Sequence, residues 1–269
     1  MKDHILMLSY GKDSLACLGA IETLGLPLTR IVHAEVWATD SVQADLPPMV
    51  DFKAKTDEII KQRWGVTVEH IWATKVDGIC GNKVSFEDVF YHKLTKGKFA
   101  GAIKGFPPTC GRWCQKLKTN AANLIASVDD IQYLGIASDE PIRIQKHESR
   151  KNIILPLVQA GWTEKQCKEW CLQNDLLSPI YTDSERGGCW FCPCQGLEQL
   201  RLLRKRYPDR WELLLKWDND SPVPFHSDGH TVHDYEKRFA LEDEGLIDPN
   251  GTFRWLMLDA PLQYKMRWE

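Results

Sequence analysis

The residues with the clearest potential for chemistry are Ser-Tyr-Gly-Lys-Asp-Ser at positions 9–14, directly after the apolar run at 5–8. The order predicts a strand, a tight turn and the first turn of a helix. Such a turn directs backbone N–H groups and the positive end of a helix dipole at one point, which favours phosphate binding. The spacing differs from the Walker pattern and lacks the three glycines of the dinucleotide fingerprint. An ordinary surface turn is the alternative interpretation.

Cysteine spacing gives a second candidate site. Cys110 and Cys114 lie four residues apart in a predicted helix and therefore on one face of it, and Cys189 and Cys192 form a Cys-x-x-Cys pair. The two pairs together would supply four thiolates, enough for tetrahedral Zn²⁺ or a [4Fe–4S] cluster. The alternative is that these are buried, reduced thiols that pack as small apolar side chains.

The remaining cysteines are weaker candidates. Cys167 and Cys171 fit simple packing on a helix that begins at Thr163, where Gln166 stands at the capping-box position. Cys194 is a candidate sulfur carrier, whereas Cys17 and Cys80 are expected to be structural.

Alternating strand and helix patterns must position these residues. Apolar runs predict strands at 4–9, 31–37, 66–72 and 131–135, and helical patterns lie at 13–25, 47–64, 109–127 and 163–175. This alternation predicts an α/β fold with a doubly wound, mainly parallel sheet. We expect a long loop with a short helix near 86–93 over residues 75–108, and further helices at 196–217 and 232–244. The expected domains are therefore residues 1–195 and a small helical C-terminal extension over 196–269.

Composition limits the class of protein. Of the 269 residues, 43% are hydrophobic and 26% are charged, as in ordinary globular proteins. No apolar run approaches the ~20 residues of a membrane span. A strand pattern starts near residue 4 and leaves no room for a signal peptide, so we expect a cytoplasmic protein. The net charge of −3 does not indicate a nucleic-acid partner.

Five stretches together resemble one family. The sequence at 9–14 resembles the Ser-Gly-Gly-Lys-Asp-Ser signature of the PP-loop nucleotide alpha hydrolases, with Tyr10 in place of a glycine. The segments at 112–118, 135–143, 156–163 and 179–193 follow in the order found in the phosphoadenosine-phosphosulfate (PAPS) reductase-like family. The resemblance covers residues 1–195 and leaves the C-terminal extension unassigned.

The resemblance implies a site for ATP or PAPS with Mg²⁺, and an enzyme that adenylylates a substrate in connection with sulfur transfer, with a sulfur donor protein as a further partner. It assigns catalysis to Lys12, Asp40 and Arg143. The nucleotide-binding residues that it implies are Ser9, Tyr10, Gly11, Lys12, Asp13, Ser14 and Gly135. It also implies that Cys110, Cys114, Cys189 and Cys192 hold the [4Fe–4S] cluster or Zn²⁺.

Two alternatives stay open. The family's reductases resemble one another in a C-terminal Glu-Cys-Gly-x-His motif, but no cysteine follows Cys194 here. A reductase would therefore need a non-standard cysteine such as Cys194. The second alternative is a non-catalytic module that binds nucleic acid or protein and retains a structural metal.

Two features of the C-terminal extension have competing interpretations. A run of basic residues suits either a nucleic-acid backbone or a solvated helix face: Arg201, Arg204, Lys205, Arg206 and Arg210. His226, His230 and His233 suggest a metal, but Thr231 before an acidic first turn is more typical of a helix N-cap.

Overall fold

The computed structural model describes residues 2–108, 112–125, 127, 129–183 and 188–255. Two compact units make up the chain. Unit 1 contains Met1–Val89 and Cys114–Cys189, and unit 2 contains Phe90–Trp113 and Trp190–Glu269. Residues 90–113 thus group with the C-terminal part of the chain, which sequence order did not indicate. The domain boundary at residue 195 stays a prediction.

Unit 1 is built on a five-stranded parallel sheet with the order β3-β2-β1-β6-β7. Its strands are β1 (His4–Met7), β2 (Arg30–Ala34), β3 (Val68–Ile71), β6 (Ile131–Tyr133) and β7 (Ile153–Ile154). A separate antiparallel hairpin pairs β4 (Lys75–Val76) with β5 (Ile79–Cys80). The α/β class is therefore confirmed, and the sheet is fully parallel.

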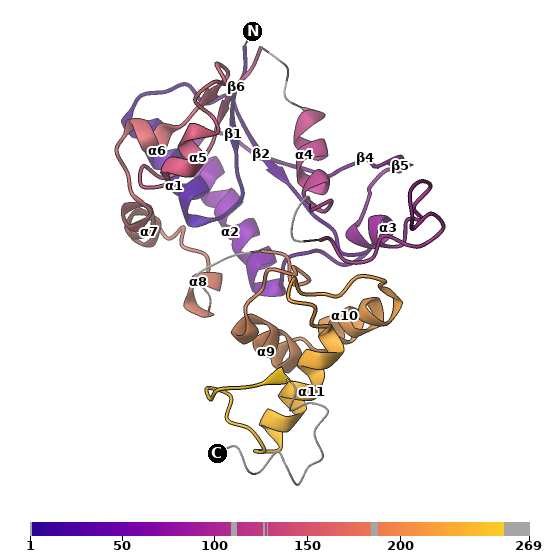
Figure 1. The fold of residues 1–269 in the computed structure, drawn as a ribbon. Coiled ribbons are helices and arrows are strands. Elements are labelled where there is room, and N and C mark those ends of the chain that lie inside the picture. Colours follow the sequence, from indigo (N-terminus) through magenta and orange to yellow (C-terminus); the bar gives the residue numbers. More distant parts are fainter. Residues whose placement is uncertain (1, 109–111, 126, 128, 184–187, 256–269) are drawn as a thin grey trace. The chain divides into compact units, whose positions relative to one another are not determined.

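Helices lie on both sides of this sheet, with α1 on one side and α4 on the other (Figure 1). The helices of unit 1 are α1 (Lys12–Thr23), α2 (Pro47–Trp64), α3 (Phe86–Phe90, whose last residue belongs to unit 2), α4 (Gln115–Asn123), α5 (Pro141–Gln145), α6 (Pro156–Gln159), α7 (Glu164–Gln173) and α8 (Ile180–Asp183). None of the described helices of the chain combines the length and hydropathy needed to cross a bilayer.

Local sequence signals account for several of these boundaries. Helix α2 begins at Pro47 and ends at Trp64, and its C-cap Gly65 adopts the left-handed conformation with φ 69°. Thr163 caps α7, and its capping box with Gln166 is confirmed. Helix α4 begins at Gln115 rather than at 109, so Cys114 stands at the N-cap and not within a helix. The glycine at position 111 interrupts the helical pattern in the sequence.

The core of unit 1 surrounds α1, which is buried on most sides. Leu15, Leu18 and Ile21 pack with apolar residues of β1, β2, α2 and α7. Cys17, Cys167 and Cys171 are fully buried in this cluster, and burial raises the pKa of each thiol. These three cysteines therefore pack as small apolar side chains, as predicted.

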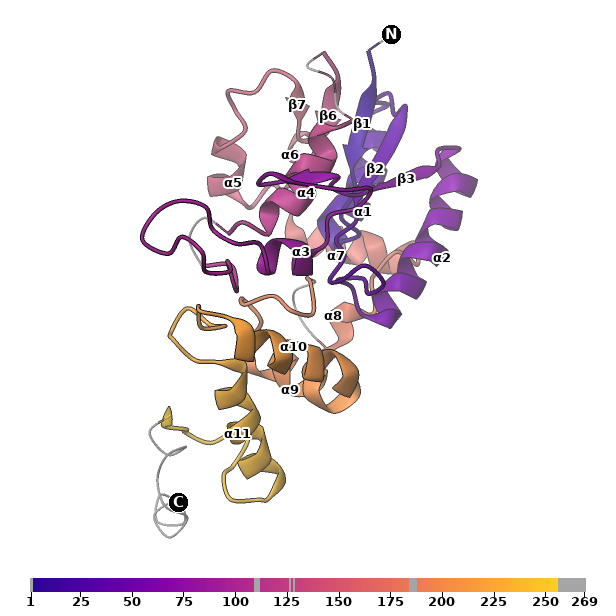
Figure 2. The same cartoon turned by 90° about the vertical axis from the view of Figure 1, so that its right-hand side faces the viewer.

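Unit 2 is helical and has an aromatic core. Its helices are α9 (Leu197–Arg206), α10 (Pro208–Asp220) and α11 (Val232–Asp243), and α10 packs against the other two (Figure 2). The rings of Trp190 and Trp217 stack with centroids 5.6 Å apart. Phe90 contacts the Trp217 ring, which ties the segment 90–113 to the C-terminal helices.

Ion pairs join α9 to α11. Arg201 donates two hydrogen bonds to Glu242, at 2.7 and 3.0 Å, and Arg204 pairs with Glu236 and Asp243. These arginines therefore neither project freely into solvent nor offer an unpaired basic face to a nucleic acid. The solvated helix face was wrong for these two residues, because acidic residues of α11 lie opposite. The nucleic-acid interpretation of the run stays a prediction.

The histidines of unit 2 form no group of metal ligands among the described residues. Thr231 caps α11 through the backbone N–H of Asp234, as predicted. His233 Nδ1 lies 2.6 Å from Asp218 Oδ2 instead.

Gly135 provides a direct test of packing in unit 1. A Cβ at this position would lie 2.6 Å from Ser14 Cα and 2.7 Å from the Asp13 carbonyl oxygen. Because both contacts are backbone, we expect Gly135→Ala to lower the free energy of unfolding by about 2–3 kcal/mol. Gly188→Ala is the control, since a Cβ there meets nothing within 4 Å. Equal urea midpoints for the two variants would contradict this close packing.

Candidate functional site

A pocket of about 670 Å³ opens in unit 1 where β1 and β2 end. Its lining includes the predicted loop residues Ser9, Tyr10, Gly11, Lys12 and Asp13. His33 and Asp45 line it from β2 and the following loop, whereas Lys118, Arg143, Glu164 and Tyr181 come from α4, α5, α7 and α8. Parallel α/β sheets collect ligands at this edge, so the fold places the sequence motif where a ligand would bind.

Serine hydroxyls hold the loop in shape. Ser14 Oγ accepts from the backbone N–H of Ser9 at 3.1 Å and donates to the Gly11 carbonyl oxygen at 3.0 Å. Ser9 Oγ lies 2.9 Å from Ser14 Oγ. Ser14 is buried and does not line the pocket, so it supports the loop while Ser9 remains available to a ligand.

Tyr10 occupies a left-handed backbone position in the turn after β1, although it is not a glycine. Its φ of 56° is left-handed, a conformation that glycine adopts freely and that costs other residues roughly 1–2 kcal/mol. The side chain is fully buried in the core, and its hydroxyl donates to Asp57 Oδ1. Burial and this hydrogen bond raise the pKa of Tyr10. Tertiary contacts thus hold the strained residue in place.

Lys12 stands at the first turn of α1 with an ammonium held by carboxylates. Its Nζ lies 2.9 Å from Asp13 Oδ1 and 3.1 Å from Glu164 Oε1. Burial lowers the pKa of Lys12, but its bonds and ion pairs with these two carboxylates outweigh this effect and raise the pKa. The Lys12 backbone N–H donates to the Tyr181 hydroxyl at 3.0 Å.

Asp13, Glu140 and Glu164 form an oxygen-rich cluster beside Lys12. One carboxylate oxygen of each lies within 4.8 Å of the others. Burial raises the pKa of Asp13, while Lys12 opposes this rise. The donor set is of the kind that Mg²⁺ prefers.

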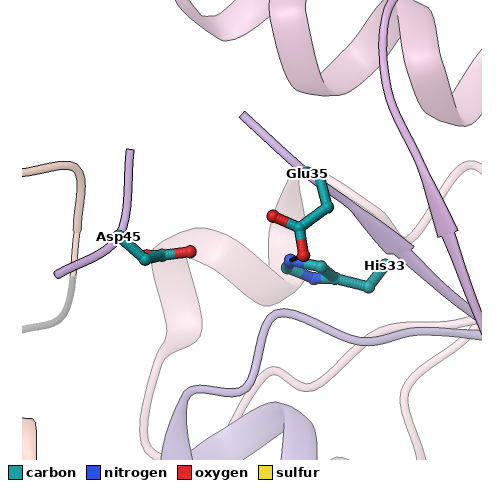
Figure 3. Close-up of side chains that lie close together, drawn as sticks. All are labelled: His33, Glu35 and Asp45. Atoms are coloured by element: carbon teal, nitrogen blue, oxygen red, sulfur yellow. Dashed lines mark ion pairs between the residues drawn. The ribbon is translucent and has the colours of Figure 1, made fainter. Parts of the chain in front are cut away.

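Beneath the pocket, the buried ammonium of Lys53 joins His33, Glu35 and Asp45, whose side chains converge in Figure 3. Its Nζ lies 2.8 Å from His33 Nε2, 3.2 Å from both Glu35 carboxylate oxygens and 2.6 Å from Asp45 Oδ2. An ammonium has three N–H donors, and three acceptor side chains surround it. These three side chains could hold a metal by residue type, but Lys53 already supplies the cation.

The surroundings of His33 define its protonation. Its Nδ1 lies 2.8 Å from the Leu8 carbonyl oxygen, so Nδ1–H donates and Nε2 accepts from Lys53. Burial and the Lys53 charge lower the pKa of His33 to about 4. Burial alone would raise the pKa of Glu35, but His70 and Lys53 bring it down to about 2. At neutral pH His33 is therefore neutral and Glu35 is ionised.

His70 connects Glu35 to Tyr10 through Asp57. Its Nδ1 lies 2.9 Å from Glu35 Oε1, and its Nε2 lies 2.8 Å from Asp57 Oδ2. Because both ring nitrogens face carboxylates, both donate, and these bonds raise the pKa of His70 to about 9. A continuous network of charged hydrogen bonds therefore runs from Tyr10 in the loop to Asp45 at the pocket wall.

The other predicted site residues fall at different places. Arg143 lines the pocket and pairs with Glu140 at 2.5 Å. Gly135 does not line it but allows the segment after β6 to approach the start of α1 closely. Asp40 is exposed and outside the pocket lining, and its carbonyl oxygen accepts from Lys83. The carboxylate that faces the pocket from this loop is Asp45.

Three of the four cysteines predicted to bind a metal lie among the described residues. Cys110 lies outside the described residues. Cys114 and Cys189 are half-buried in unit 1, and Cys189 lines the pocket, whereas Cys192 belongs to unit 2. The four-thiolate centre stays a prediction.

Sequence analysis missed the Lys53 network, although two signals pointed to it. His33 and Glu35 are polar residues in and just after an otherwise apolar strand pattern. Lys53 shares the buried face of α2 with Met49, Phe52, Thr56 and Ile60. A lysine on a buried helix face must find acceptors, which is a reason to seek carboxylates nearby.

Comparison of the chain with family models, with curated proteins and with solved structures gives no match.

Removal of the Tyr10 hydroxyl tests its role in the loop. Tyr10→Phe leaves Asp57 without one of its donors, so we expect a loss of about 1.5–3 kcal/mol in unfolding free energy by urea titration at neutral pH. Tyr207→Phe is the control, because no hydrogen bond of the Tyr207 hydroxyl is seen among the described residues, and it should cost less than about 0.5 kcal/mol. Similar losses in both variants would contradict the proposed support.

The pH dependence of stability tests His70. The pKa of His70 is about 9 in the folded protein and 6.5 ordinarily. The stability that the charged ring contributes is therefore complete below pH 6.5 and is lost as pH rises through about 9. Because solvent screens this half-exposed ring, we expect a modest effect. The difference in unfolding free energy between wild type and His70→Gln should fall by about 1–2 kcal/mol between about pH 6 and pH 10. A difference that does not change with pH would show that His70 is not an ionic partner.

Proposed function

We propose that the pocket of unit 1 binds ATP or an adenylyl sulfonucleotide such as PAPS, and that the chain adenylylates a substrate in a reaction linked to sulfur transfer. One observation carries this proposal. The 9–14 loop, which includes Lys12, lines one pocket together with Lys118 and Arg143 at the carboxyl edge of a parallel sheet. The proposed family is that of the PP-loop, PAPS reductase-like proteins.

Charge and shape support a nucleotide. The three cations suit a phosphate chain, and the N-terminus of α1 adds its dipole at the same point. Pockets for small ligands usually measure about 300–1,000 Å³, and this pocket lies within that range. In this proposal Lys12 exchanges its carboxylate partners for phosphate oxygens when the nucleotide binds.

The residues also fit the cofactors that the proposal needs. Asp13, Glu140 and Glu164 would hold Mg²⁺, which would offset charge on the phosphate oxygens. Neutral His33 offers little basicity, since its pKa is about 4. Lys53 holds the Asp45 carboxylate at the pocket wall, where it can accept a hydrogen bond from a ribose hydroxyl.

The cysteines are the residues that support the sulfur-transfer part of the proposal. Thiolates at Cys110, Cys114, Cys189 and Cys192 would suit Zn²⁺ or a [4Fe–4S] cluster by donor type. Cys189 is the member that lines the nucleotide pocket, which favours a role near the bound substrate. A reductase with Cys194 and a non-catalytic binding module remain the alternatives.

Nucleotide binding provides the test. We expect Lys12→Met to weaken the binding of ATP with Mg²⁺, measured by calorimetry, at least about tenfold, because the pocket loses the ammonium at the start of α1. Lys61→Met on α2 is a matched control away from the pocket and should bind within about twofold of wild type.

Failure of wild type to bind either ATP or PAPS would overturn the proposal. Binding of PAPS with release of sulfite in the presence of a thiol reductant would instead favour the reductase. Binding without any turnover would favour the non-catalytic module.

A further inference from the structure

Unit 2 contains a second pocket, of about 450 Å³, that neither the loop motif nor the predicted cysteine centre explains. Its lining comes from the segment that leads into α9, from the loop before α11, and from α11 and the residues after it. The lining includes Cys194, Gly196, His226, Tyr235, Arg238 and Trp255. All belong to unit 2, so the pocket is complete within one compact part of the chain.

A buried guanidinium dominates this pocket. Arg238 is 7% exposed, and its Nε donates to Glu242 Oε1 at 3.0 Å. Its two terminal amino groups donate no hydrogen bond to any residue in the described ranges. Neither amino group is among the described buried polar atoms that lack a partner, so both are open to solvent at the pocket and can donate to a bound anion.

Arg238 shares its carboxylate partner with Arg201, and Asp228 and Asp234 lie near Tyr235 in the same part of unit 2. Arg201 donates two hydrogen bonds to the same Glu242 carboxylate that pairs with Arg238. Glu242 is almost fully buried and carries one negative charge for two guanidinium groups. Glu198 also pairs with Arg201, but it is largely exposed and therefore well screened.

The beginning of α9 adds a second element that attracts anions. Gly196 is the N-cap and has no side chain to accept from the first N–H groups of the helix. Gly196 and Leu197 line the pocket together with Arg238. A helix N-terminus and a guanidinium both favour an oxyanion, although the first turn of α9 also carries Glu198.

Aromatic side chains shape the rest of the pocket. Tyr235 is buried, and Trp255 stacks on His230 with ring centroids 3.8 Å apart. The Arg238 guanidinium lies 4.3 Å from the Phe253 ring centroid and 5.6 Å from that of Trp255. This volume exceeds what a bare phosphate ion fills, and its aromatic wall suits an organic group.

From these observations the geometry points to a binding site in unit 2 for a small organic phosphate. Its phosphate group would lie between the terminal amino groups of Arg238 and the start of α9, and its organic part would pack on Tyr235 and Trp255. This site shares no lining residue with the proposed nucleotide pocket of unit 1.

Calorimetry on the full chain tests it, in a Lys12→Met background that weakens the other phosphate site. The probes are phenyl phosphate, inorganic phosphate and phenol. We expect phenyl phosphate to bind at least about tenfold more tightly than either of the others, because only it satisfies both the cationic and the aromatic part of the site. Inorganic phosphate that binds equally well would overturn the assignment to an organic ligand, and no binding of phenyl phosphate would overturn the site.

Matched variants locate the binding. Arg238→Met should weaken phenyl phosphate at least about tenfold, whereas Arg210→Met, outside the pocket lining, should change it less than about twofold. If Arg238→Met does not fold, Arg238→Lys keeps the charge without the planar fork and should weaken binding about fivefold. Unchanged affinity in the folded variant would overturn the inference.

Alkylation gives an independent readout. Cys194 lines the pocket, and its Sγ lies 3.0 Å from Arg112 Nη1. Phenyl phosphate should slow the reaction of Cys194 with iodoacetamide, followed by mass spectrometry of its peptide. Exposed Cys80 in unit 1 is the internal control and should react at the same rate throughout. Equal protection of both thiols, or of neither, would overturn the placement.

Discussion

The site of unit 1 depends on the contacts between the buried ammonium of Lys53 and its three acceptor side chains. Moving a charge out of water costs several kcal/mol unless partners replace the lost hydration, and here three side chains do so. His33 belongs to β2, and Glu35 and Asp45 to the segment that follows it, while Lys53 belongs to α2. One side chain therefore joins the strand end, the pocket wall and a helix.

The hydrogen bonds around Lys53 extend to the loop at positions 9–14. His70 links Glu35 to Asp57, and Asp57 accepts from the Tyr10 hydroxyl. Tyr10 can keep its left-handed backbone because its ring is packed and its hydroxyl is bound. The turn that presents Lys12 is thus held by charges beneath it and not only by its own sequence.

Unit 2 uses buried charge differently. Arginines of α9 pair with acidic residues of α11, and one carboxylate, Glu242, serves both Arg201 and Arg238. In unit 1 every N–H of the Lys53 ammonium has an acceptor, whereas the end of Arg238 faces a pocket. The Lys53 ammonium therefore stabilises unit 1, whereas the ligand proposed for unit 2 would bind at the end of Arg238.

The sequence by itself determined the α/β class, helix α2 with its stop at Gly65, the capping box at Thr163 and the loop at the edge of the sheet. These features depend on neighbours a few residues apart or on hydrophobic periodicity, which the sequence displays directly. Only the tertiary structure decided that Asp45 rather than Asp40 faces the pocket, and that Lys53 holds it there. The partners of a buried charge come from separate elements, and no local pattern specifies which of them will meet.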